Sequence, residues 1–314
     1  MARRSVTNVN ILLAIDKPAG CTSHDVVARV RRSLGERRVG HAGTLDPMAT
    51  GVMVVGVGQG TRLLGRLTLD TKAYLADIAF GAETNTDDAE GEVTRTVELD
   101  ERLLDAAFAA QAVEALVGPQ QQVPPAFSAI SVGGVRSYKR ARAGEDVELP
   151  ARAIEVLSAQ LIDCRALDSG AYVWTVAFTV SKGTYIRALA RDLGRSLNSA
   201  AHLVGLRRLA SGSIALKDCV TLDELDPDVA RARALDPVAA LGLPALAITD
   251  ETEEHVLCGR RLSPALITHR VDLRVPGARF CLLAHNELRA IAQFDGRAIR
   301  MEDVFPQPVG GVRQ

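Results

Sequence analysis

The stretch GHAGTLDPMATG, residues 40–51, places a single carboxylate in a short loop. Gly, Thr and Pro around Asp46 favour a tight turn, and an aspartate in such a setting commonly caps a turn or a helix. An ionised carboxylate could instead attack an electrophilic carbon or stabilise a developing positive charge. The loop alone leaves both interpretations of Asp46 open.

Other familiar chemistries lack their full pattern. The segment GVGQGT, residues 56–61, has the spacing G-x-G-x-G with no G-K-[ST] after it, so neither nucleotide-binding fingerprint is complete. Its glycines are better explained as the end of a strand. The five cysteines form no C-x-x-C pair and the six histidines no H-x-x-x-H pair, so a metal site has no obvious ligand set.

Composition is that of a globular chain with an uneven charge distribution. The 314 residues are 47% hydrophobic and carry a net charge of −1. Residues 1–66 nevertheless hold ten Lys or Arg against four Asp or Glu, and residues 182–208 hold six against one. Such clusters suit a phosphate backbone, although solvated helix faces are an alternative explanation. No segment is typical of a membrane span or a signal peptide, so we expect a cytoplasmic protein.

Hydrophobic periodicity predicts strands and helices in irregular alternation, hence a mixed sheet with helices packed on it. The expected strands cover residues 11–16, 51–58, 72–83 and 171–180, and the expected helices 22–34, 100–118 and from 184 onward. A shift to Asp, Pro and Ala places a domain junction near 235–245, followed by short β-like runs typical of a small barrel-like module. Residues 123–155 form a long excursion with a basic cluster, which is usually functional or disordered.

Six motifs in a fixed order carry a family resemblance: LLAIDKPAGCTSHDVV, HAGTLDPMATG, KAYLADIAFGAETNTDDAEG, VPPAFSAISVGGVRSYKRARAG, SKGTYIRALARDLG and AHLVGLRRLASG. Together they resemble the pseudouridine synthases of the bacterial tRNA pseudouridine synthase B type. The resemblance implies an α/β (α+β) fold with a mixed, mainly antiparallel sheet flanked by helices. It also implies a catalytic domain over 1–240, with an RNA-contacting insertion at about 123–155, and a small β-rich PUA-like RNA-binding domain over 241–314.

The implied reaction is the isomerisation of a uridine to pseudouridine in the T-loop of tRNA, at position 55. The N1–C1′ bond breaks, the uracil turns, and C5 bonds to the sugar without any redox change. This chemistry needs no metal and no other cofactor, so none is expected. The implied partner is the T-arm of tRNA, with no membrane and no obligate protein partner.

The resemblance also assigns roles to individual residues. Asp46 corresponds to the family's nucleophile and Arg187 to the arginine that pairs with it, while Tyr74 corresponds to the tyrosine that stacks on the uracil and is a candidate for proton transfer. The expected substrate contacts are His41, Tyr185, Leu206, Asp88, Arg136 and Lys139. Lys17 lies in a matched motif and is expected to be structural.

Two positions depart from the family pattern. Ser131 stands where a lysine is frequent, which puts one RNA contact in doubt, and Asn85 replaces a frequent acid in an expected surface turn. Two alternative functions remain open: a non-catalytic RNA-binding or tRNA-folding protein, and a guide-RNA-dependent pseudouridine synthase. Retention of Asp46 and Arg187 argues against the first, and the absence of a longer basic tail against the second.

Overall fold

The computed structural model describes residues 9–68, 71–128, 130–132, 135–137, 140, 145, 149–168 and 170–313. The chain forms two compact units. The first contains Met1–Pro47, Gly51–Leu69 and Ser211–Gln314, and the second contains Met48–Thr50 and Asp70–Ala210. The boundaries of these units differ from the expected domain junction at residues 235–245, and the division into domains at that junction stays a prediction.

In the first unit, β1 (Ile11–Lys17) pairs antiparallel with β3 (Thr50–Val57), which also pairs with β2 (Val39–Ala42). Side chains on β1 alternate between two cores, as the pleat of a strand requires. Leu13 and Ile15 face the helix α1 (Ser23–Leu34), whereas Leu12 and Ala14 face a core shared with the C-terminal strands. Burial on both faces explains why β1 is a continuous apolar run.

Helix α1 begins where its capping residues predict. The Thr22 side chain accepts a hydrogen bond from the Asp25 amide, and the Asp25 carboxylate accepts one from the Thr22 amide. This capping box satisfies two of the amides that the first helical turn leaves without partners. The helix ends at Gly35, whose φ of 63° suits a residue without a side chain.

The C-terminal part of the first unit is a four-stranded sheet in the order β14 (Ala245–Ala247), β15 (Arg279–Ala284), β16 (Glu287–Phe294) and β17 (Ile299–Val309). The β14 and β15 pair is parallel and the other pairs are antiparallel. Helix α8 (Asp250–Leu257) contributes Val256 to the core of this sheet. Short connecting helices precede it: α2 (Leu64–Leu67), α6 (Pro227–Ala232) and α7 (Pro237–Leu241).

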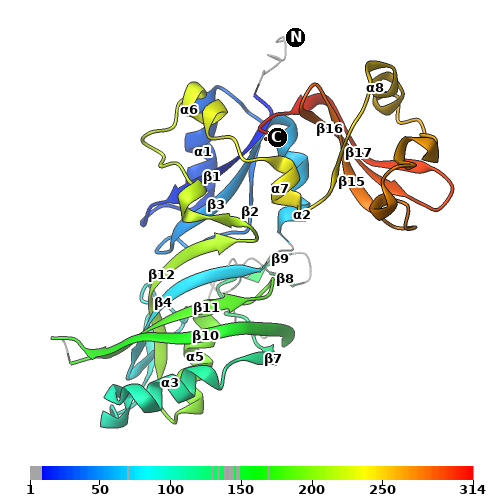
Figure 1. The fold of residues 1–314 in the computed structure, drawn as a ribbon. Helices are drawn as coiled ribbons and strands as arrows, with labels where there is room; N and C mark the ends of the chain where they lie inside the picture. The colour runs from blue at the N-terminus through cyan, green and yellow to red at the C-terminus, as the bar shows by residue number, and fades with distance from the viewer. Residues whose placement is uncertain are drawn as a thin grey trace. The chain divides into compact units, whose positions relative to one another are not determined.

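The second unit is built on a sheet whose strands follow one another in the order β12, β4, β11, β10 and β7 (Figure 1). Their bounds are Ala201–Ser211, Lys72–Phe80, Tyr172–Val180, Arg152–Ala166 and Gly118–Gln122. Helix α3 (Ala106–Glu114) packs against β10, and α5 (Ile186–Ser196) against β4. The short hairpins β5–β6 (Ala82–Thr84, Val93–Thr96) and β8–β9 (Ser131–Val132, Val135–Arg136) complete the unit.

The predicted fold class is confirmed: a mixed, mainly antiparallel sheet with helices, and a C-terminal β-sheet. The helix expected over 100–118 is shorter than predicted. A 3-10 turn over Glu101–Leu104 comes first, and α3 starts only at Ala106, because the Asp105 carboxylate accepts from the amides of Ala107 and Phe108. Of the glycines in GVGQGT, Gly56 lies near the end of β3 and the other two follow it, and a side chain at Gly60 would collide with the Ile11 carbonyl.

Trp174, the sole tryptophan, provides a test of packing in the second unit. It is fully buried, its ring centroid lies 4.6 Å from that of Phe80, and its indole N–H donates to the Leu103 carbonyl at 2.7 Å. Trp174→Phe leaves that carbonyl without its donor, so the free energy of unfolding should fall by about 1–3 kcal/mol. Urea unfolding followed by circular dichroism measures this. Val117→Ala, at an exposed site, should change it by less than about 0.5 kcal/mol.

Candidate active site

Asp46 lies in a loop whose backbone is fixed on both sides. On one side, the buried Ser23 hydroxyl donates to the Leu45 carbonyl at 3.0 Å and accepts from the Leu45 amide at 2.9 Å. On the other, the Pro47 carbonyl accepts from the Gly20 amide at 3.0 Å and from Lys17 Nζ at 3.1 Å. The half-buried Asp46 is therefore held on a rigid backbone rather than on a mobile loop.

Lys17 owes its role to complete burial. Its Nζ also donates to the Pro18 carbonyl at 3.0 Å, and none of its surface is exposed. A buried ammonium must be surrounded by acceptors, so it ties the end of β1 to the loop that follows Asp46. The interpretation of Lys17 as structural agrees with this geometry.

His41 lies on β2 in the same unit. Its ring meets that of His24 edge to face, with centroids 5.9 Å apart and an interplanar angle of 81°. His41 is partly exposed, and its imidazole and that of His24 on α1 lie side by side near the start of the Asp46 loop. Its predicted contact with RNA stays a prediction.

Tyr74 and Leu206 lie on neighbouring strands of the second unit. Tyr74 is 7% exposed and stands opposite Phe178 in the β4–β11 ladder. Leu206 is partly exposed on β12, directly after Gly205. Gly205 allows close approach to Asp77 of β4, since an added Cβ would lie 2.6 Å from the Asp77 carboxylate.

Tyr185 marks the N-terminus of α5 and is fixed through its backbone. The side-chain amide of Gln122 accepts from the Tyr185 amide at 2.9 Å and donates to the Tyr185 carbonyl at 3.1 Å. The Arg152 guanidinium lies over the Tyr185 ring, 5.1 Å from its centroid. A single buried glutamine thus sets the direction in which α5 begins.

Arg187, in the first turn of α5, is buried rather than exposed. Its Nη1 lies 3.3 Å from Asp88 Oδ2 and donates to the Thr86 carbonyl at 2.8 Å, while Nη2 donates to the Phe127 carbonyl at 3.1 Å. Arg187 and Asp88 are 5% and 4% exposed. The structure therefore brings together two of the predicted site residues. Asp88 also accepts from the Thr86 hydroxyl at 2.6 Å.

A second buried ion pair lies beside the first and was not predicted. Arg191 Nη1 donates to Asp87 Oδ2 at 2.8 Å, and both residues are less than a tenth exposed. Burial raises the pKa of Asp87 from 3.8 to about 6, against the opposing attraction of Arg191 and then of Arg187. The adjacent acids in TDDAEG and the i, i+4 arginines in IRALAR were the signals in the sequence.

Two predicted RNA contacts lie partly or wholly outside what the structure describes. The Arg136 backbone pairs with Ser131 in the β8–β9 hairpin, but its side chain is not among the described parts. Lys139 lies outside the described residues. Asn85 is exposed, and its amide and side-chain oxygen bond to the backbone of Glu92, which fits the expected surface turn.

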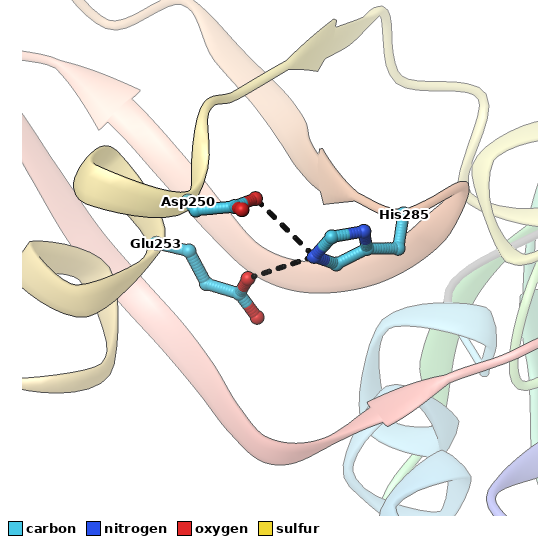
Figure 2. A group of neighbouring side chains, drawn as sticks. All are labelled: Asp250, Glu253 and His285. Atoms are coloured by element: carbon cyan, nitrogen blue, oxygen red, sulfur yellow. Dashed lines mark ion pairs between the residues drawn. The ribbon is translucent and has the colours of Figure 1, made fainter.

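Among the described residues, one group of side chains has the spacing of metal ligands: Asp250, Glu253 and His285 (Figure 2). The His285 ring reaches both carboxylates, with Nε2 3.3 Å from Asp250 and 3.6 Å from Glu253. Arg289 already lies 2.5 Å from Glu253, so a cation there would face a guanidinium. The arrangement is an ion-pair cluster at the start of α8.

None of the helices in the described part combines the length and apolar character needed to cross a membrane.

The Ser23 clamp on the Asp46 loop can be tested by its effect on stability. Ser23→Ala leaves the buried amide and carbonyl of Leu45 without their partner, so we expect the free energy of unfolding to fall by about 1–3 kcal/mol. Urea titration measures the change. Ser213→Ala, at an exposed turn, is the matched control and should differ from the wild type by less than about 0.5 kcal/mol. Equal effects of the two substitutions would contradict the clamp.

Asp87 should give stability an unusual pH dependence. Between pH 3.8 and about 6, the folded protein keeps a proton that the unfolded chain has lost. The stabilisation that Asp87 contributes to the folded state is therefore fully present below the pKa of the unfolded chain. It declines as the pH rises to the pKa of the folded protein, by about 3 kcal/mol in all. Urea titrations from about pH 4 to about pH 7 should show the wild type losing stability relative to Asp87→Asn. A difference independent of pH would argue against the raised pKa.

Two models of known families together match residues 31–240. The model described as TruB family pseudouridylate synthase (N terminal domain) matches residues 31–186. The model described as tRNA pseudouridylate synthase B C-terminal domain matches residues 187–240. Asp46, Tyr74, Asp88 and Tyr185 fall in the first match, and Arg187 and Leu206 in the second.

Individual relatives agree with this. The tRNA pseudouridine synthase B of Thermobifida fusca is 48% identical over 88% of this chain and 94% of its own length. That of Nocardia farcinica is 45% identical over 96% and 94%. An H/ACA RNP bound to a substrate RNA containing 2′-deoxyuridine contains a chain of similar fold, with a TM-score of 0.65 at 21% identity over 96% of this chain and 86% of that one. This chain belongs to the TruB family of pseudouridylate synthases, and it is therefore an isomerase.

Proposed function

We propose that this chain converts the uridine at position 55, in the T-loop of tRNA, into pseudouridine, and that the Asp46 carboxylate starts the reaction. Its family acts on uridine, and its relatives of 45–48% identity are named tRNA pseudouridine synthases. The observation that supports Asp46 most is the double clamp on its backbone, through Ser23 on one side and Lys17 on the other. A reactive group needs such a fixed position.

The chemistry makes one demand on a carboxylate. Asp46 either adds to the nucleoside or stabilises positive charge at C1′ while the N1–C1′ bond breaks. The uracil then turns and C5 forms the new bond to C1′. The C5 hydrogen leaves as a proton, and N1 regains one from solvent. No electron is gained or lost, so the step needs no oxidant or reductant.

Arg187 is the cationic group that we assign to the Asp46 carboxylate. A buried carboxylate stays ionised only when positive charge or hydrogen-bond donors compensate its lost hydration. The burial of Arg187 and its ion pair with Asp88 support a guanidinium that is fixed rather than solvated. We therefore assign Asp88 to hold Arg187 in place, and we propose this in preference to a direct contact between Asp88 and RNA.

The remaining predicted residues would receive the flipped nucleotide. A base inside a folded loop must leave its stack before a carboxylate can reach its sugar. Tyr74 offers a buried aromatic ring for stacking on the uracil, and Tyr185 and Leu206 offer apolar contacts. His41 would stack among the displaced nucleotides.

The wider RNA contacts follow the charge distribution. We propose that the insertion at about 123–155 contacts the T-arm through its basic residues, Arg136 and Lys139 among them. The C-terminal sheet would act as a PUA-like RNA-binding domain. The protein would work without a protein partner, in the cytoplasm where its tRNA substrate is found.

Release of tritium from C5-labelled uridine in tRNA tests the role of Asp46. Because the new C5–C1′ bond expels that hydrogen, the wild type should release label into water. Asp46→Asn should release it at least about a thousandfold more slowly, with tRNA binding retained. Asp223→Asn, an exposed acid paired with Arg29, is the matched control and should behave as wild type.

Two further measurements decide between the alternatives. A tRNA with cytidine at position 55 should release no label, and release from it would overturn the assigned position. Purified protein alone should suffice. Tight binding of tRNA without release, by wild type and variant alike, would favour a non-catalytic RNA-binding protein, and activity only with a guide RNA complex would favour a guide-dependent synthase.

A further inference from the structure

Two arginines on α5 bond to the same two segments of the second unit, residues 86–88 and 123–127. Arg187 and Arg191 are four residues apart, so their side chains leave the same face of the helix one turn apart. Arg187 bonds to the Thr86 carbonyl and to the Phe127 carbonyl. Arg191 bonds to Asp87 and, through Nη2, to the Val123 carbonyl at 2.8 Å. The second arginine thus repeats the clamp of the first.

We propose that the Asp87–Arg191 ion pair positions Arg187 and Asp88 for the isomerisation. Asp87 and Asp88 are chain neighbours, so the two ion pairs hold one loop by adjacent residues. If Arg191 released Asp87, the loop would lose one side-chain restraint, and a small shift of Asp88 would carry the Arg187 guanidinium with it. This inference rests on the catalytic role proposed above for Arg187. Neither Asp87 nor Arg191 is assigned a contact with substrate.

The backbone of Asp87 shows that the loop is held in an unusual shape. Its φ of 61° lies in the left-handed region, which few residues other than glycine, asparagine and aspartate occupy. Flanking hydrogen bonds fix this conformation, since the Asp87 carbonyl accepts from the Leu203 amide at 3.1 Å and the Ala89 amide donates to the Leu203 carbonyl at 2.9 Å. Glycine and asparagine would also fit this backbone, but neither supplies a carboxylate for Arg191.

The environment of Asp87 argues against an ion pair kept for stability. The charged groups with the largest effect on Asp87 belong to α5: Arg191, Arg187, Asp192 and Arg195. Burial still raises its pKa to about 6, so the ionised form costs stability at neutral pH. The cost comes from burying the carboxylate, and Arg191 offsets only part of it, so together with the contacts described above this buried acid points to a positioning role.

A third ion pair on the same helix provides an internal contrast. Arg195, one further turn along α5, bonds to Glu83 with both Nε and Nη2. Its side chain is 55% exposed, and hydrogen bonding by Arg195 holds the pKa of Glu83 below its usual range. Among the described hydrogen bonds and ion pairs of Arg195, none reaches the 86–88 loop or the 123–127 segment. It is therefore the matched control: the same residue type, helix and pairing chemistry without the clamp.

Arg191 also connects the active site to the proposed RNA-contacting insertion. Val123 is the first residue of that insertion, and its carbonyl shares the Arg191 guanidinium with Asp87. Nε of the same group bonds to Asp192 at 2.8 Å, so all three sides of the guanidinium are engaged. A lysine has a single ammonium and cannot reproduce this planar set of contacts.

The test measures tritium release in single turnovers with enzyme in excess over tRNA, alongside the tRNA Kd and the thermal midpoint. Arg191→Gln should slow release about 10- to 100-fold, because a small displacement of a catalytic group is costly, while the Kd changes less than about twofold. Asp87→Asn keeps the left-handed backbone accessible and should slow release in the same direction. Arg191→Lys should recover only part of the loss, and Arg195→Gln should stay within about twofold of wild type.

The double variant Asp87→Asn/Arg191→Gln separates positioning from general destabilisation. If the two residues act as one pair, it should be no slower than Arg191→Gln alone. Additive losses, a wild-type rate for Arg191→Gln, or an equal loss in Arg195→Gln would overturn the inference. Should Arg191→Gln not fold, the rate of Asp87→Asn alone decides. Asp46→Asn and Arg187→Gln are measured in parallel, because full activity in these would instead overturn the proposed function.

Discussion

The second unit depends on one constraint: a buried guanidinium must find acceptors for its five N–H groups. Helix α5 buries Arg187 and Arg191 almost completely, and each carboxylate supplies only part of what is needed. Backbone carbonyls of Thr86, Val123 and Phe127 supply more. Because carbonyls belong to the main chain, satisfying the arginines also fixes the course of two segments far apart in sequence.

In the first unit, two side chains satisfy the backbone polar groups beside Asp46. The Asp46 loop must keep its own backbone polar groups satisfied in the conformation that presents its side chain. The Ser23 hydroxyl does this as donor and acceptor at Leu45, and the fully buried Lys17 does it at Pro47. In both units, side chains bonded to the main chain fix the loops that carry the proposed reactive groups. Rigid loops of this kind reduce the reorganisation that a reaction requires.

Pattern reasoning predicted the elements whose signal is local. The apolar run of β1, the capping box of α1 and the alternation of β4 lie in contiguous residues, and each was found close to its expected place. The helix near residue 105 is shorter than predicted. An aspartate inside a helix and an aspartate that caps one look alike in a sequence, and Asp105 caps α3. Asp87 and Arg191 were missed because their pairing joins residues more than a hundred positions apart.

The long separation of Asp87 and Arg191 in the sequence also explains a difference between the two approaches. The family resemblance identified some residues of the site, and physical analysis of the structure identified others. Resemblance selects residues that recur in motifs, and it selected Arg187 and Asp88 but gave no reason for their neighbours. Burial and charge select residues that the fold has difficulty accommodating, such as Asp87, whose carboxylate is buried and has a raised pKa. Replacing a buried ion pair by apolar groups often leaves stability unchanged or improves it. Stability alone therefore does not account for the Asp87–Arg191 pair, whereas the proposed role of keeping Arg187 in register with this loop would.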